Sequence, residues 1–172
     1  MTRSLRTSLA ATTMLLVAAS AARAQNAHTP VEIGVSAGSV VSWFTTPFAG
    51  GDVRVAVPVN DAGDVEVIAG FPFAASRHDD IAGFYGVQFR QRIRKGATAT
   101  LQPFATYGGM GVVVRGSHAW VMPPIIGLVG AGVEQRLGRV ALRAEAQVVA
   151  FVVPAGIRMA AGLSVPIGPR RR

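Results

Sequence analysis

Apolar and polar residues alternate along most of this chain. In VALRAEAQVVAF, residues 140–151, the polar side chains Arg143, Glu145 and Gln147 occupy every second position among valines, a leucine and alanines. A helix with 3.6 residues per turn would scatter these three side chains around its axis, whereas a strand places all three on one face. The segment therefore predicts a β-strand with one polar face and one apolar face.

Seven further segments carry this alternation, one of them weakly. The clear ones are 31–43, 53–59, 65–73, 81–93, 125–137 and 156–168, and the weak one is 99–109, in which Gln102 and Thr106 share a face with Phe104. Short glycine-bearing turns follow three of the strands, in NDAG, RKG and LGR, and longer links separate the others. This rhythm is typical of an even-stranded antiparallel barrel with tight turns at one end and longer loops at the other. The fold class that we predict is all-β, an eight-stranded antiparallel up-and-down transmembrane β-barrel.

The residue types on the polar face indicate that it points inward. A soluble sheet protein also alternates, but its polar residues face water. Such a face would be dense in lysine and glutamate, and this chain has one lysine, Lys95, in a predicted turn. The polar positions carry many glycines, alanines and serines instead, which suit the crowded inside of a narrow barrel. The apolar faces would then contact lipid, where only a closed barrel pairs every backbone group of a strand.

The charged residues on the predicted inner face are of both signs. A buried charge without a partner is costly, so we expect the glutamates and arginines to pair across the lumen and fill it. The predicted lumen charge network consists of Glu32, Arg54, Glu66, Arg90, Arg92, Glu134, Arg136, Arg143, Glu145 and Arg158. Aromatic residues near the longer links suggest an interfacial girdle there. They are Trp43, Phe44, Phe71, Phe73, Phe84, Tyr85, Tyr107 and Phe151.

The two ends of the chain differ from the body in composition. Residues 1–24 read as a cleaved signal peptide, with Arg3 and Arg6 before a short apolar run and Ala22-Arg23-Ala24 at the cleavage site. Residues 25–168 then form a single β-barrel domain, and 169–172 a basic tail. The formal charge of +8 falls to about +2 without the arginines of these two ends. Because the remaining charges are dispersed, we expect no nucleic-acid partner.

The strand pattern resembles that of the small eight-stranded outer-membrane β-barrel proteins of Gram-negative-type bacteria. The resemblance covers residues 31–168 and rests on the pattern, since no signature motif is present. It implies short periplasmic turns, longer surface loops and a packed polar interior. Proteins of this class usually end on an aromatic residue, whereas here GLSVPIG ends in Val165 and Ile167 and is followed by PRRR.

Few residues suggest chemistry. Ser117 and His118 are adjacent in RGSHAW, and some outer-membrane barrels are lipid A deacylases that use serine and histidine, but adjacency alone does not make a nucleophile and its base. His78 precedes two aspartates in SRHDD, a weak cation motif that is more typical of a polar loop. The chain has no cysteine, which excludes disulfides and cysteine-ligated metals. We predict no catalytic, cofactor-binding or metal site.

These observations lead to three hypotheses on function. The first is a non-enzymatic, porin-like cell-envelope barrel in the outer membrane, monomeric in outer-membrane lipid, with a largely plugged polar lumen and a structural, adhesive or envelope-integrity role. The second is a soluble exported β-barrel that binds a small apolar ligand in an apolar interior. The third, more remote, is an outer-membrane lipid-modifying enzyme that uses Ser117 and His118.

Overall fold

The computed structural model describes residues 30–42, 48–60, 62–73, 81–93, 100–114, 120–121, 126–150 and 154–167. Within them, every regular element is a β-strand. The strands are β1 (Val31–Ser42), β2 (Phe48–Asn60), β3 (Gly63–Pro72), β4 (Ile81–Arg92), β5 (Leu101–Val114), β6 (Trp120–Val121), β7 (Ile126–Leu137), β8 (Val140–Ala150) and β9 (Pro154–Ile167). None of these residues belongs to a helix that is long and apolar enough to cross a membrane.

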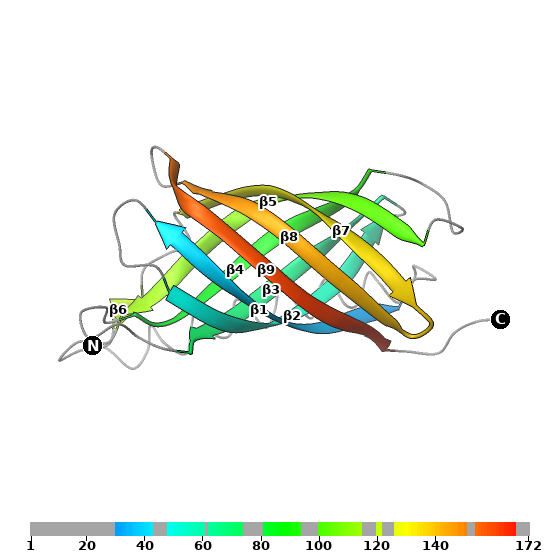
Figure 1. The fold of residues 1–172 in the computed structure, drawn as a ribbon, viewed down its shortest axis with the longest axis horizontal. Helices are drawn as coiled ribbons and strands as arrows, with labels where there is room; N and C mark the ends of the chain where they lie inside the picture. The colour runs from blue at the N-terminus through cyan, green and yellow to red at the C-terminus, as the bar shows by residue number, and fades with distance from the viewer. Residues whose placement is uncertain are drawn as a thin grey trace.

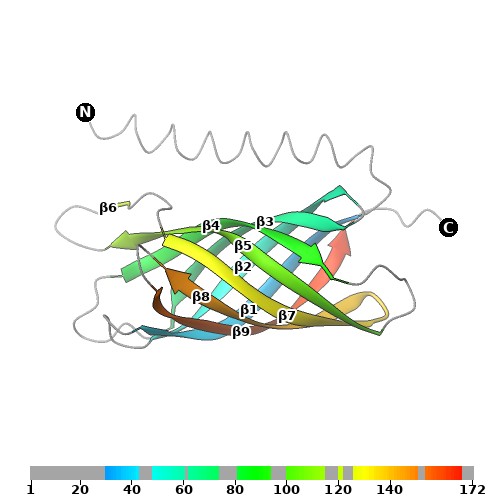
Figure 2. The same cartoon turned by 90° about the horizontal axis from the view of Figure 1, so that it is seen from above.

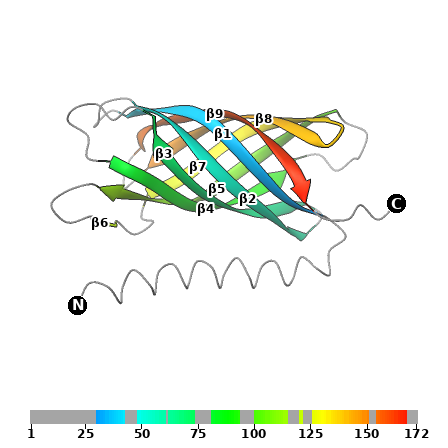
Figure 3. The same ribbon diagram turned by 90° about the horizontal axis from the view of Figure 1, so that it is seen from below.

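Eight of the strands form one closed antiparallel barrel (Figure 1). Each long strand pairs with the next one along the chain, and the ladder of β1 with β9, from Val31↔Ile167 to Ser42↔Gly156, closes the ring. The two-residue strand β6 lies outside the ring and pairs only with the end of β5. Views turned by 90° show the tilted strands forming the wall on every side (Figures 2 and 3). The predicted eight-stranded antiparallel barrel is confirmed.

Two of the three predicted tight turns lie in the described part of the chain. Asn60 pairs with Gly63 across a two-residue loop, and the Ala62 N–H donates to the Asn60 side-chain oxygen at 2.9 Å. Leu137 pairs with Val140 across another, in which Gly138 has φ 65°, a left-handed conformation that glycine adopts without steric cost. The third turn, at residues 94–96, lies outside the described residues. Both visible turns, the start of β1 and the end of β9 lie at one end of the barrel, named here the short-turn end.

The barrel is apolar outside and polar inside. Along β8 the inner side chains are buried and the outer ones exposed at strict alternation. Large apolar side chains point out of the wall, such as Val129, which is 64% exposed, and Leu163, which is 47% exposed. Glu66 and Arg90 point inward and are 0% and 2% exposed. The soluble ligand-binding hypothesis required an apolar interior and is therefore wrong.

The interior has a second, apolar tier that the sequence pattern did not predict. Near the end opposite the short turns, five buried side chains from five strands pack together, with Val112 and Ile126 against them. They are Ile68, Phe84, Met110, Leu128 and Val149. The prediction that placed Phe84 in an interfacial girdle is wrong, because its ring points into the barrel over Gly70, where a Cβ atom would lie 2.2 Å from the ring.

The other aromatic residues are divided. Phe71 and Phe73 are exposed at the end of β3, with their rings edge to face and the ring centres 5.8 Å apart. This exposure is what an interfacial girdle requires. Tyr107 lies halfway along β5, where its ring centre is 5.4 Å from that of Phe89 and the two rings are tilted by 41°, so it does not belong to a girdle at the end of the barrel. The predicted girdle positions Trp43, Phe44 and Phe151 lie outside the described residues.

Candidate functional site

Charged side chains from seven strands meet inside the barrel. The structure places all ten residues of the predicted lumen network there or at its rim, each in at least one ion pair. Two aspartates, Asp52 and Asp64, join them and were not predicted. Six arginines therefore face six carboxylates, and the interior is formally neutral. The apolar tier closes over this network at the end away from the short turns.

Arg90 on β4 is the centre of the lower half of the network, nearer the short turns. Its guanidinium donates to Glu134 at 2.6 Å, to Asp64 at 2.7 Å and to Glu32 at 2.9 Å, and lies 3.2 Å from Glu66. The four carboxylates come from β1, β3 and β7, so one side chain connects opposite walls of the barrel. Because the hydrogen bonds converge from three strands, Arg90 fixes the spacing of the walls at this level.

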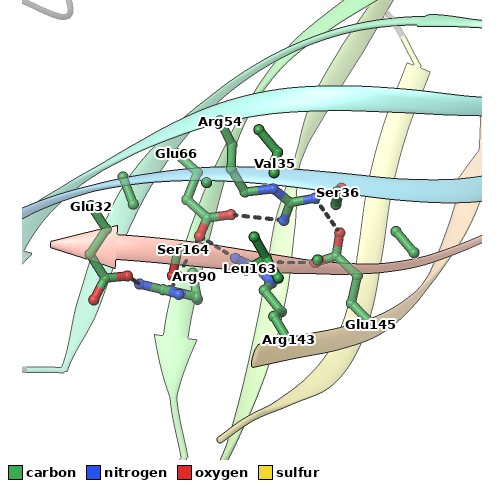
Figure 4. Close-up of a pocket in the computed structure, with 14 residues that line it drawn as sticks. Glu32, Val35, Ser36, Arg54, Glu66, Arg90, Arg143, Glu145, Leu163 and Ser164 are labelled. Carbon is green, nitrogen blue, oxygen red and sulfur yellow. Dashed lines mark hydrogen bonds and ion pairs between the residues drawn. The ribbon is translucent and has the colours of Figure 1, made fainter. Parts of the chain in front are cut away.

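Glu145 on β8 has the corresponding place in the upper half. It accepts from Arg143 at 2.5 Å, from Arg158 at 2.7 Å and from Arg54 at 3.1 Å. Figure 4 shows Arg54 and Arg143 reaching from opposite sides toward Glu145 and Glu66. Glu66 also takes a hydrogen bond from Arg143, so the upper and lower halves form one continuous network.

A chain of amides continues the network toward the apolar tier. The Gln88 amide donates to Glu66 at 2.6 Å, and the Gln147 amide donates to Gln88 at 2.8 Å and to Thr106 at 3.1 Å. Arg158 in turn donates to the Gln147 oxygen at 2.8 Å. The two amide side chains thus have partners at a level of the barrel where a buried unpaired group would be costly. Gln147 had been expected to line the lumen, and Gln88 and Thr106 complete the chain.

An aromatic ring fills the remaining space beside Arg143. Phe104 is almost fully buried, and the Arg143 guanidinium lies 4.4 Å from the centre of its ring, in cation–π contact. The ring fits because residue 132 on the adjacent strand is glycine, where a Cβ atom would lie 2.4 Å from the ring edge. Glycines at inward positions therefore make room for long side chains, as the composition of the inner face indicated.

The rim at the short-turn end is the most open part of the network. Arg136 contacts Glu32 at 2.9 Å and Glu134 at 3.2 Å while its side chain stays 51% exposed, and Arg92 contacts Asp64 at 2.8 Å. These pairs share carboxylates with Arg90, which is buried just above them. The network thus runs from the solvent-accessible rim into the fully buried middle of the barrel.

The side chains leave little free space. The cavity between Arg54, Glu66, Arg143 and Glu145 has a volume of about 10 Å³, room for about one water molecule. Two buried nitrogens beside it, Arg54 Nη1 and Arg143 Nε, have no hydrogen-bond partner among the described residues. One water molecule in this cavity would satisfy such donors. A drug-sized ligand needs a pocket of about 300 Å³ or more.

The chemistry available to this site is limited by the pairing itself. Every acidic side chain in the described segments has an arginine partner, so none is free to act as a general base. No group of three potential metal ligands occurs among the same residues. The candidate serine–histidine pair at 117–118 and the SRHDD motif at 76–80 lie outside the described residues.

Comparison with known proteins finds solved structures of the same fold but assigns the chain to no family. No family model matches the chain, and no curated protein matches it. Among solved structures, the N-terminal β-barrel domain of Pseudomonas aeruginosa OprF matches with a TM-score of 0.58 and 9% identity, over 79% of this chain and 97% of that one. Neisserial surface protein A matches with a TM-score of 0.56 and 14% identity, over 82% and 98%.

A third match is a transmembrane β-barrel designed de novo, with a TM-score of 0.56 and 14% identity, over 81% of this chain and 96% of that one. At such low identities the likeness shows the fold alone. The chain has the fold of the small eight-stranded outer-membrane β-barrels, as its strand pattern predicted.

Proposed function

We propose that this chain is a non-enzymatic β-barrel protein of the bacterial outer membrane that serves a structural, adhesive or envelope-integrity role. The single observation that carries the proposal is the inverted barrel, in which a paired ionic network fills the interior and valines, leucines and isoleucines cover the outside. An apolar surface this extensive is unfavourable in contact with water and has to be covered by another molecule. A lipid bilayer covers it on every side of a closed barrel.

The height of the apolar surface matches a membrane. On β9, outward residues are apolar from Ile157 to Ile167, which is ten residue steps. At about 3.3 Å per residue and a tilt of about 40°, these steps span about 25 Å along the barrel axis. The apolar band of outer-membrane barrels is about 25 Å tall. The observed surface is therefore tall enough to cross an outer membrane once.

The packed interior favours a structural role over transport. A porin keeps a water-filled channel, whereas small eight-stranded barrels fill theirs with side chains. Here the ionic network and the apolar tier occupy successive levels of the lumen. Ions passing along the axis would have to displace both. We propose that the protein conducts no ions, and that contacts with other molecules are made at the ends of the barrel.

Export is part of the proposal. Residues 1–24 have the order of features of a cleaved signal peptide, and the mature chain would begin at Gln25. The eight long strands close into a ring within one chain, which supports a monomer surrounded by outer-membrane lipid. The links of the end opposite the short turns would then face the cell surface, as in barrels of this architecture.

Membrane fractionation with a gel shift tests this function. The protein expressed in a Gram-negative host should be found in the outer membrane, with its N-terminus at Gln25, and should migrate faster in an unheated sample than in a boiled one. Recovery from the soluble periplasm without a shift would reject the proposal. Planar-bilayer recordings then separate the structural role from transport. For this protein we expect no current steps beyond those of a protein-free bilayer, while a wide porin measured in parallel should conduct.

A further inference from the structure

The two strands that close the ring carry small inward side chains at one level of the barrel. Gly34 on β1 pairs in register with Ser164 on β9. Arginines on the neighbouring strands approach this level from either side, because Arg54 on β2 pairs with Gly34 and Arg143 on β8 pairs with Gly162. A Cβ atom at Gly34 would lie 3.2 Å from Arg54 Cγ. The two arginine side chains therefore lie beside the closing strands, where the wall contributes glycine and serine.

A cavity lies between these two arginines and the closing strands (Figure 4). Its volume is about 10 Å³, which is room for about one water molecule. Besides the arginines, its lining includes the hydroxyl-bearing Ser36 and Ser164 and the carboxylates of Glu66 and Glu145. Hydrogen-bond donors and acceptors both surround the cavity, as a buried water molecule requires.

Two nitrogens beside this cavity lack a hydrogen-bond partner among the described residues. They are Arg54 Nη1 and Arg143 Nε, and both side chains are more than nine-tenths buried. A buried donor without an acceptor is costly. Arg54 Nη1 lies 3.9 Å from Glu66 Oε2, too far for a direct hydrogen bond. Two hydrogen bonds of about 2.8 Å that meet at one oxygen atom bridge about 4–4.6 Å, close to this separation.

The ligand of this cavity has to be small, uncharged and able to accept hydrogen bonds. The interior holds six arginines and six carboxylates, so an anion would leave one net negative charge in a sealed space, which is costly. A cation cannot accept hydrogen bonds from guanidinium groups. We propose that one ordered water molecule is a permanent ligand of this cavity, where it accepts from Arg54 Nη1 and Arg143 Nε and donates to Glu66.

Such a water molecule exchanges slowly with solvent. On the side of the short turns, Arg90 and its four carboxylates fill the lumen. On the other side lies the apolar tier. The water molecule leaves only when these side chains move apart, so it stays bound far longer than a hydration water at the rim. It is therefore a fixed link between β2, β3 and β8 rather than part of a water-filled channel.

NMR spectroscopy of the unaltered full-length protein, folded in deuterated detergent micelles, tests the proposal directly. The Arg143 Nε–H proton should show a nuclear Overhauser contact with water, whose sign in a rotating-frame measurement distinguishes it from proton exchange. The Arg90 Nε–H proton is the control, because it donates to Asp64 at 2.9 Å and should show no such contact. Loss of the signal in Arg143→Lys assigns the resonance.

Two variants at one lining position separate the water molecule from the rest of the network. Ser164→Asn extends an amide into the cavity, and its oxygen accepts from the arginines in place of the water. The contact of the Arg143 Nε–H proton with water should then be lost. Ser164→Ala removes the hydroxyl but keeps the cavity open, so the contact should remain. The gel shift between unheated and boiled samples shows that each variant is folded.

Three outcomes would overturn the proposal. The unaltered protein could show no contact between water and the Arg143 Nε–H proton, or the contact could survive in folded Ser164→Asn. A saturable shift of the same resonance on addition of bromide would assign the cavity to an anion instead. If Ser164→Asn does not fold, the comparison of Arg143 with Arg90 in the unaltered protein decides alone. The measurement does not depend on where the barrel resides, so its failure leaves the proposed function untouched.

Discussion

Removing the buried Arg90 should destabilise the barrel more than removing an arginine at the rim. The Arg90 guanidinium is 2% exposed and holds four carboxylates within 3.2 Å. In Arg90→Ala these carboxylates keep their remaining arginines, but the sealed interior gains one uncompensated negative charge. Breaking a buried ion pair on one side costs about 3–5 kcal/mol. With a urea m-value of about 2 kcal/mol/M, the unfolding midpoint should fall by about 2 M.

Arg136 provides the matched control for this prediction. It contacts Glu32 and Glu134, two of the same carboxylates, but its side chain is 51% exposed at the rim. Exposed ion pairs contribute about 0–1 kcal/mol, so Arg136→Ala should shift the midpoint by less than about 0.5 M. The two variants remove the same side-chain type from two shared partners, Glu32 and Glu134, and differ in the burial of the arginine and in the two further carboxylates that Arg90 contacts.

Urea titration in lipid vesicles, followed by the folded fraction on unheated gels, measures both midpoints. If Arg90→Ala fails to fold, Arg90→Gln combined with Glu134→Gln restores neutrality and should recover more than about 1 kcal/mol relative to Arg90→Gln alone. Equal midpoints for Arg90→Ala and Arg136→Ala would refute the reasoning, because the network would then contribute no more in the interior than at the surface.

Three further predictions concern packing and the lipid-facing wall. Gly132→Ala places a Cβ atom 2.4 Å from both a buried phenylalanine ring and a carbonyl oxygen, so urea titration should show that the unfolding free energy falls by about 1–3 kcal/mol. In the control Gly127→Ala on the same strand, the new Cβ atom meets nothing closer than 3.5 Å, and the unfolding free energy should change by less than about 0.5 kcal/mol. Val133→Arg, halfway along β7, should cost about 2–4 kcal/mol in vesicles and Leu137→Arg at the rim about 0–1 kcal/mol, and equal costs would contradict a bilayer around this wall. Leu128→Ala should lower the unfolding free energy by about 2–5 kcal/mol. Bilayer recordings should still show no ion conduction, because the ionic network below Leu128 stays intact. New current steps would mean that the apolar tier alone blocks the lumen.

The strands and the sense of their faces could be predicted from the sequence because side chains alternate with a period of two. That period assigns a residue such as Arg143 or Glu145 to the inner face without any knowledge of its partners. The scarcity of lysine then distinguished an inward polar face from a solvated one. All ten charged residues of the predicted network lie in the interior or at its rim for this reason.

The two missed aspartates show the limit of this reasoning. The patterns of β2 and β3 were read from Val53 and Val65, and the structure extends both strands toward their N-termini. Asp52 and Asp64 thereby become inward-facing positions with arginine partners. Hydrophobic alternation has no signal at a strand end, where a charged residue is equally compatible with a turn. A count of charges carried the missing signal, since four predicted carboxylates could not neutralise six arginines.

The apolar tier could not be predicted for a different reason. Ile68, Phe84 and Leu128 are inward residues among apolar outward neighbours, so a period of two gives them no contrast. Their burial follows from the register between strands, which places them at one level of the barrel. Register depends on pairing across the closed ring, and that information is not contained in any one segment of the sequence.

The central claim is that the apolar face of this barrel lies in lipid, and β8 offers its most direct test. Because the chain has no cysteine, Leu142, Ala144, Ala146 and Val148 can each be replaced by a fluorophore-labelled cysteine, and all four face outward. In intact outer membranes the account predicts that brominated lipids quench every label, most strongly near the middle of the strand, and that aqueous iodide quenches none. Quenching by iodide with no effect of brominated lipid would place this face in water and contradict the account.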